Sequence, residues 1–177
     1  MTRRQFVAAS LAATSLTAAP ARRWRLGLNT YCLRFQKWTD RQLFDYVIQQ
    51  KLDAIFLQDS LDPRVMDPAH WAEVRAWSRE AGLRIETGGG AILPKTRDGI
   101  PQSVATLRRN IERAKAMGSP IVRALLASDR YNMPEGSVEQ HMDTAIRILR
   151  EVRQPALDAG LKIGIENHKE LMAFQTR

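Results

Sequence analysis

The sequence predicts an α/β fold in which short strands alternate with amphipathic helices around a parallel sheet. Two observations support this prediction. First, the 177 residues contain five short apolar segments, each separated from the next by a segment with helical periodicity. Second, AGLRIETG at residues 81–88 is echoed by AGLKIGIE at residues 159–166. In both stretches a glycine closes a helix and a strand follows at once, which is typical of a repeated βα unit.

The five predicted strands are short and mostly apolar. In chain order they cover residues 25–29, 54–58, 84–87, 121–125 and 162–166. Gly88, Gly89 and Gly90 follow the third strand and are predicted to form a turn. No Gly-Lys-Ser/Thr sequence accompanies them, so they do not indicate a phosphate-binding loop.

The helices between the strands begin at residues that are typical of helix starts. Thr39 and Ser137 are each followed three residues later by a glutamine, which is the spacing of a capping box. Asp67 precedes Pro68, an N-cap followed by a proline in the first helical turn. The last helix contains Pro155, which lacks a backbone N–H and should kink the helix unless the helix ends there.

Strand parity favours a barrel over an open sheet. Side chains alternate between the two faces of a strand, so if the isoleucines of KIGIE (residues 162–166) face the helices, Glu166 and His168 point inward. The same alternation directs Glu86 and Asn29 into that space. Polar groups aimed at one lumen from parallel βα units are typical of a TIM barrel. A doubly wound sheet would usually carry a glycine-rich turn after its first strand, where this sequence has NTYCLRFQKW.

Glu166 is the first candidate for a functional site, because barrel enzymes build their sites at the carboxyl ends of the strands. A partly buried carboxylate is costly unless it binds a cation or an ion-pair partner. Glu166 is therefore a candidate metal ligand, and the alternative is a salt bridge to an inward arginine, Arg25 or Arg123. Asn167 and His168 beside it would orient a substrate hydroxyl or carry protons.

Other candidates lie at the remaining strand ends and loops. Glu86 is an inward acid near the end of the third strand and a candidate for catalysis together with His168. His70 and His141 lie in amphipathic helix patterns away from strand ends and are interpreted as packing residues. The candidates for substrate binding are Asn29, Trp38, Arg123 and Asn167.

The first residues have the order of an export signal. Arg3 and Arg4 precede a short apolar region of small residues, and an A-x-A cleavage sequence follows at residues 19–21. We expect residues 1–21 to be a twin-arginine signal read by the export machinery, and residues 22–177 to be periplasmic or secreted. The alternative is a disordered or helical extension. No apolar run approaches the ~20 residues of a membrane-spanning helix.

The charge and the single cysteine narrow the choice of partners and cofactors. The net charge is +8, but the arginines of TLRRNIERAK and AIRILREVR are spaced as the solvated faces of helices, so nucleic acid is not an expected partner. Cys32 is alone in the sequence, which excludes an intramolecular disulfide and a cysteine-based metal site.

IENH at residues 165–168, the two strands that begin after AGL and the inward acid of RIETGGG together resemble the sugar phosphate isomerase/epimerase family of xylose isomerase-like TIM barrels. The resemblance covers the first five of eight βα units. It implies a divalent cation, either Mn, Mg, Co or Zn, held by Glu166 and by Asp, His and Glu ligands from later strands. It also implies isomerisation or epimerisation of a sugar or polyol through an ene-diolate.

The sequence departs from this family in two respects. Strand two ends in Gln58 and Asp59, where many relatives have a glutamate. The chain is also shorter than the roughly 250 residues of a complete barrel, so we expect a fragment that does not catalyse by itself. Two alternatives stay open: an apurinic endonuclease-like phosphodiesterase of the same fold, and a carbohydrate-binding relative without catalysis. A homo-oligomer is compatible with either.

Overall fold

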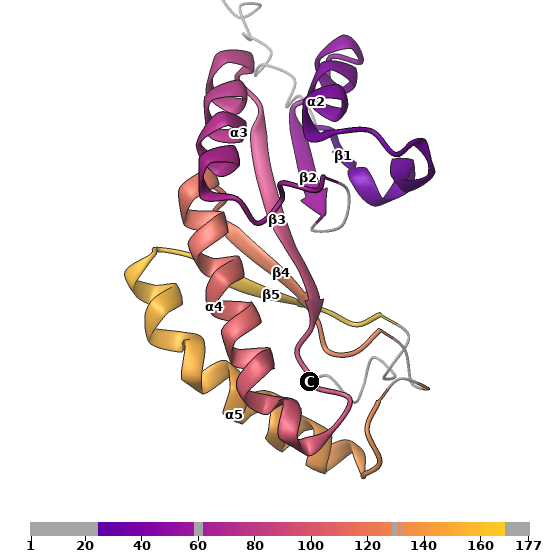
Figure 1. The fold of residues 1–177 in the computed structure, drawn as a ribbon, viewed down its shortest axis with the longest axis vertical. Helices are drawn as coiled ribbons and strands as arrows, with labels where there is room; N and C mark the ends of the chain where they lie inside the picture. Colours follow the sequence, from indigo (N-terminus) through magenta and orange to yellow (C-terminus); the bar gives the residue numbers. More distant parts are fainter. Residues whose placement is uncertain (1–24, 59–61, 129–130, 132, 169–177) are drawn as a thin grey trace, which may run out of the picture.

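The computed structural model describes residues 25–58, 62–128, 131 and 133–168, so the expected export signal at residues 1–21 lies outside the described residues. Figure 1 shows the strands and helices alternating along the chain. The strands are β1 (Gly27–Asn29), β2 (Ala54–Gln58), β3 (Arg84–Ala91), β4 (Ile121–Leu125) and β5 (Lys162–Glu166). The helices are η1 (Thr30–Gln36), α2 (Asp40–Gln49), α3 (Pro68–Ala81), η2 (Arg97–Gly99), α4 (Ile100–Met117) and α5 (Val138–Asp158).

The five strands form one parallel sheet in the order in which they occur in the chain, β1-β2-β3-β4-β5. Each strand pairs with the next in parallel. The intervening helix returns the chain to the edge of the sheet at which the strands begin. A parallel sheet in sequential order, with one helical crossover per step, is the arrangement of successive barrel units. The predicted α/β class and parallel sheet are confirmed.

Two apolar cores lie between the sheet and the helices that cover it. One lies beneath α2 and α3 and includes Phe44, Val74 and Ile85. The other lies beneath α4 and α5 and includes Ile111 and Ile148. Figure 1 shows α3, α4 and α5 beside the sheet, in the order in which they occur in the chain. Among the residues that the structure describes, no helix combines the length and apolar character needed to cross a membrane.

The predicted turn at Gly88, Gly89 and Gly90 is wrong, because β3 continues through all three glycines to Ala91. The register between β3 and β4 shifts in this part of the strand, which marks a bulge. Gly88 has a φ of 147°, and a Cβ at this position would overlap the backbone of Arg123. The glycine is needed because only a residue without a side chain allows β4 to lie this close.

The predicted helix starts are confirmed. Thr39 and Ser137 each accept a hydrogen bond from the backbone of the glutamine three residues on, and both capping boxes are complete. Asp67 accepts from the Ala69 amide, with proline in the first turn. Helix α5 continues through Pro155 to Asp158. β1 begins at Gly27, two residues later than predicted, because pairing with β2 starts at Gly27 while the Leu26 backbone bonds to Asp53.

The outer strands leave apolar surface exposed among the described residues. Ile165 of β5 is 52% exposed and Leu157 of α5 is 53% exposed. Both side chains line a groove together with Leu149 and Ile163. The groove is an exposed apolar surface formed by α5 and β5.

Candidate functional site

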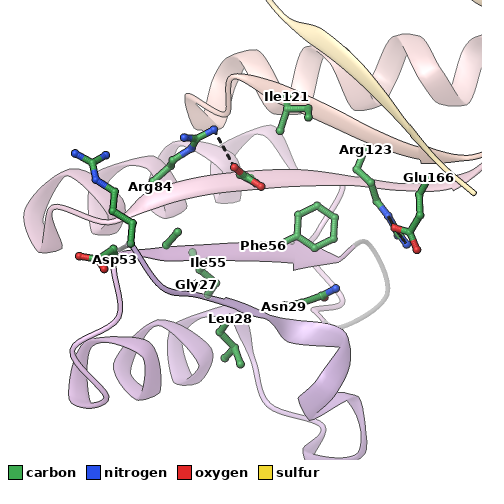
Figure 2. A pocket seen from close by; sticks show the side chains of 13 residues that line it. Gly27, Leu28, Asn29, Asp53, Ile55, Phe56, Arg84, Ile121, Arg123 and Glu166 are labelled. Atoms are coloured by element: carbon green, nitrogen blue, oxygen red, sulfur yellow. Dashed lines mark hydrogen bonds and ion pairs between the residues drawn. The ribbon is translucent and has the colours of Figure 1, made fainter. Parts of the chain in front are cut away.

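A cavity of about 520 Å³ lies on the face of the sheet opposite the helices. All five strands contribute to it, and Figure 2 shows side chains from several of them projecting into the same space. Asn29, Glu86 and Glu166, which strand parity directs inward, all line this cavity. The alternate residues Ile85 and Ile163 pack into the helical cores instead, so the alternation is confirmed for these strand residues. His168, which strand parity also directs inward, is not among the residues that line the cavity.

The cavity has two charged ends. Figure 2 shows Asn29, Arg123 and Glu166 gathered toward the carboxyl ends of the strands. Arg84 and Asp53 lie toward the opposite end. Barrel enzymes place their chemistry at the carboxyl end, so the first group is the candidate active site.

Glu166 is paired with Arg123 across the β4–β5 step. Nε and Nη2 of Arg123 each lie 2.5 Å from Oε2 of Glu166. The guanidinium also lies over the ring of Phe56, 5.6 Å from its centroid. Of the two roles that the sequence allows for Glu166, the structure contains the salt bridge. A role for Glu166 as a metal ligand stays a prediction, because the salt bridge uses the same carboxylate that a cation would bind.

His168 is oriented by a main-chain hydrogen bond. Its Nδ1 lies 2.7 Å from the carbonyl oxygen of Ser128. A carbonyl can only accept, so Nδ1 carries a proton, and in the neutral form of the ring Nε2 is an acceptor. Asn167 lies between His168 and Glu166 in the chain and is exposed.

The remaining candidates have local partners. Glu86 forms an ion pair with Arg84, with 2.9 Å between Oε1 and Nη2. The Asn29 side-chain oxygen accepts from the Tyr31 amide at 3.0 Å and from Nε2 of Gln58 at 3.2 Å.

Trp38 lies apart from the cavity. Its ring packs against Tyr46 of α2, with 5.5 Å between the centroids, beside the core of α2 and α3. A substrate contact for Trp38 stays a prediction.

Sequence reasoning missed a second polar cluster, formed by Asp40, Asp62 and His70. His70 is buried as expected of a packing residue, but its Nε2 lies 2.9 Å from Oδ2 of Asp40 and 3.9 Å from Oδ2 of Asp62. The backbone N–H of Asp40 also donates to Asp62. The three residues come from three segments, so the sequence carries little signal for them. Asp40 and His70 lie in the first turns of α2 and α3, where polar residues are ordinary, and Asp62 lies in the segment before α3.

Burial and hydrogen bonding shift the pKa values of Asp40 and Asp62 in opposite directions. Burial raises the pKa of Asp40, against the hydrogen bond from His70. Burial alone would also raise the pKa of Asp62, but hydrogen bonds from the backbone amides of Arg64 and Asp40 outweigh it and lower the pKa below its ordinary value. Asp62 is therefore the more strongly ionised partner.

No family model matches the sequence, and no curated protein matches it. Several solved structures do. D-psicose 3-epimerase from Clostridium cellulolyticum H10, solved with D-tagatose, is 15% identical with a TM-score of 0.66, over 79% of this chain and 51% of that chain. A sugar phosphate isomerase/epimerase from Parabacteroides distasonis is 14% identical with a TM-score of 0.57, over 88% and 55%. The fold is that of the xylose isomerase-like TIM barrels.

A third structure, the IOLI protein with a bound zinc atom, is 14% identical with a TM-score of 0.65, over 81% of this chain and 51% of that chain. The chain spans about half the length of the solved structures it matches. The predicted fold, about five units of a TIM barrel, is therefore confirmed by the sheet and by these structures together.

Proposed function

We propose that this chain forms the amino-terminal part of a barrel that isomerises or epimerises a sugar or polyol. The observation that carries the proposal is that Asn29, Arg123 and Glu166 all line one cavity, toward the carboxyl ends of its strands. The names of the similar structures, which include D-psicose 3-epimerase and a sugar phosphate isomerase/epimerase, support this reaction class.

The cavity suits a polyhydroxylated molecule. Its volume of about 520 Å³ falls in the range of small-molecule sites. The guanidinium of Arg123 donates hydrogen bonds, and the carboxylate of Glu166 accepts them, so the pair matches the alternating donors and acceptors of sugar hydroxyls. The ring of Phe56 provides an apolar wall for the C–H face of a sugar.

Two residues are proposed to move protons. His168, with Nδ1 held by Ser128, offers Nε2 to accept a proton from carbon or hydroxyl. Glu86 lines the cavity and is the second candidate base, after release from Arg84. An epimerisation needs one group to remove a proton and another to return it from the opposite face, which two such residues would provide.

A divalent cation would polarise the substrate carbonyl and the neighbouring hydroxyl. Glu166 offers a carboxylate oxygen for it, but among the described residues the group of three ligand-type side chains close enough to hold an ion lies elsewhere, at Asp40, Asp62 and His70. The described residues do not complete a cation site in the cavity, and the steps above use none.

Sugar binding tests the proposal directly. We expect D-fructose and D-tagatose to bind the full chain in calorimetric titrations, and Arg123→Gln to weaken binding about tenfold or more, because a charge-assisted donor is lost. Arg147→Gln, at an exposed arginine of α5, is the control and should bind as the unmodified chain does. Equal binding by both variants, or no binding by any, would contradict the proposal.

Turnover is expected only in a protein that carries the further barrel units. In that protein, proton exchange at the sugar carbon next to the carbonyl would be followed by NMR in D₂O. We expect Glu166→Gln to lower the exchange rate and Glu112→Gln, at an exposed residue of α4, to leave it unchanged. Unchanged exchange in Glu166→Gln would remove Glu166 from the reaction.

A further inference from the structure

The cluster of Asp40, Asp62 and His70 lies outside the cavity, on the helix side of the sheet. Asp40 is the first residue of α2, Asp62 lies in the segment between β2 and α3, and His70 is in the first turn of α3. Their side chains are 1%, 1% and 0% exposed. The cluster therefore joins three separate segments at a point that is closed to solvent.

The imidazole of His70 faces acceptors on both sides. Nδ1 lies 3.4 Å from Oε2 of Glu73, one turn along the same helix. Nε2 faces Oδ2 of Asp40 and Oδ2 of Asp62. When Nδ1–H donates to Glu73, the neutral ring presents a lone pair at Nε2, directly toward carboxylate oxygens that also carry lone pairs. This arrangement is unfavourable unless a positive species lies between them.

The two carboxylates of the cluster are buried, and Nε of Arg64 lies 3.8 Å from Oδ1 of Asp62. A buried carboxylate is costly unless its oxygens are paired or bound. In addition, Oδ1 of Asp40 is buried and accepts no hydrogen bond from the described residues.

Two species could lie between the imidazole and the carboxylate oxygens, a proton on Nε2 or a metal ion. A proton at Nε2 makes one short hydrogen bond, to Oδ2 of Asp40, and leaves Oδ1 without a partner. A metal ion binds several oxygens at once and can also bind the second oxygen of the same carboxylate. The unsatisfied oxygen therefore favours the metal ion.

We propose that Asp40, Asp62 and His70 bind a zinc-class divalent cation. One imidazole nitrogen with carboxylate oxygens suits zinc, with bonds of about 2.0–2.2 Å. Two such bonds span up to about 4.4 Å, and Nε2 of His70 lies within that reach of both carboxylates, 2.9 Å from Oδ2 of Asp40 and 3.9 Å from Oδ2 of Asp62. Glu73 completes the pattern, because a histidine that binds a metal usually donates its other N–H to a carboxylate. The ion would tie α2, α3 and the segment between β2 and α3 together.

Zinc titration of the full chain tests this site separately from the cavity. Glu166→Gln removes the candidate ligand of the cavity, and we expect this variant to keep one tightly bound zinc ion. Asp62→Asn should weaken that binding more than about tenfold, and Glu73→Gln by about tenfold, since outer partners of a ligand typically contribute this much. Asp45→Asn is the matched control, an exposed aspartate of α2 paired with Arg41, and should bind zinc as before.

X-ray absorption on the zinc-loaded Glu166→Gln chain keeps the test decisive if Asp62→Asn does not fold. We expect one imidazole and otherwise oxygen ligands around the zinc. Loss of tight zinc binding in Glu166→Gln, a zinc shell without imidazole, or unchanged affinity in a folded Asp62→Asn would each overturn the proposal. Sugar binding in the cavity would be unaffected by these results, so the two proposals fail independently.

Discussion

Gly88→Ala should destabilise the protein strongly, because the glycine lies against the backbone of the neighbouring strand. Its φ of 147° is in a region that residues with side chains rarely adopt, at a cost of about 1–3 kcal/mol. An added Cβ would also overlap the backbone oxygen and nitrogen of Arg123, which cannot move aside as a flexible side chain would. Overpacking adds about 1–3 kcal/mol more. The loss is on the order of 3 kcal/mol or more, a large share of the roughly 5–15 kcal/mol that stabilises a domain.

Urea denaturation followed by circular dichroism measures this loss, and Gly82→Ala provides the control. Gly82 ends α3 with a φ of 64°, yet a Cβ there meets nothing within 4 Å. Only the cost of the left-handed conformation remains, about 1–2 kcal/mol. If Gly88→Ala lost no more stability than Gly82→Ala, the close approach of β3 and β4 would not be the reason for the glycine. The local surroundings of Arg123 should change together with this loss of stability in Gly88→Ala.

Three further predictions concern other parts of the chain. Ser137→Ala removes the cap of α5 and should cost about 1 kcal/mol in chemical denaturation, whereas Ser128→Ala, outside any helix, should cost less. The pKa of Glu139 is lowered below its ordinary value by hydrogen bonds from its own backbone N–H and from Ser137. Ionised Glu139 therefore stabilises the folded protein above the pKa of this group in the unfolded chain, and this stabilisation is lost as the pH falls through its pKa in the folded protein. An NMR titration should show a higher midpoint for Glu139 in Ser137→Ala. Replacing Arg3 and Arg4 by lysines should stop export in a fractionation assay if residues 1–21 are a twin-arginine signal; continued export would show another route.

Most of the fold could be predicted from the sequence because it depends on local patterns. Strand alternation at residues 162–166 and the capping residues Thr39 and Ser137 act within a few residues, so their structural outcome is visible in the sequence. The same holds for the inward direction of Glu166, which follows from parity alone. The bulge at Gly88 could not be predicted in this way, because its cause is the backbone of β4, more than thirty residues later.

The partners of the site residues were also beyond local patterns. The sequence left Arg25 and Arg123 as equal candidates for an ion pair with Glu166, and only the register of β4 with β5 decides for Arg123. His70 looked like an ordinary packing residue because its partners come from two other segments. Such contacts depend on how helices dock, which a single sequence does not reveal.

The sequential order of the strands has a consequence for how the structure assembles. Every described strand pairs with the strand that precedes it in the chain. Each pairing therefore closes a loop of a few tens of residues, and none of these pairings requires a segment that is distant in the sequence. Closing short loops costs little entropy, so assembly can proceed from the first unit onward as the chain emerges. Among the described strands, β2, β3 and β4 have a neighbour on both sides, while β1 and β5 have one. Amide exchange should therefore be slowest in the middle of the sheet and fastest at its two flanks.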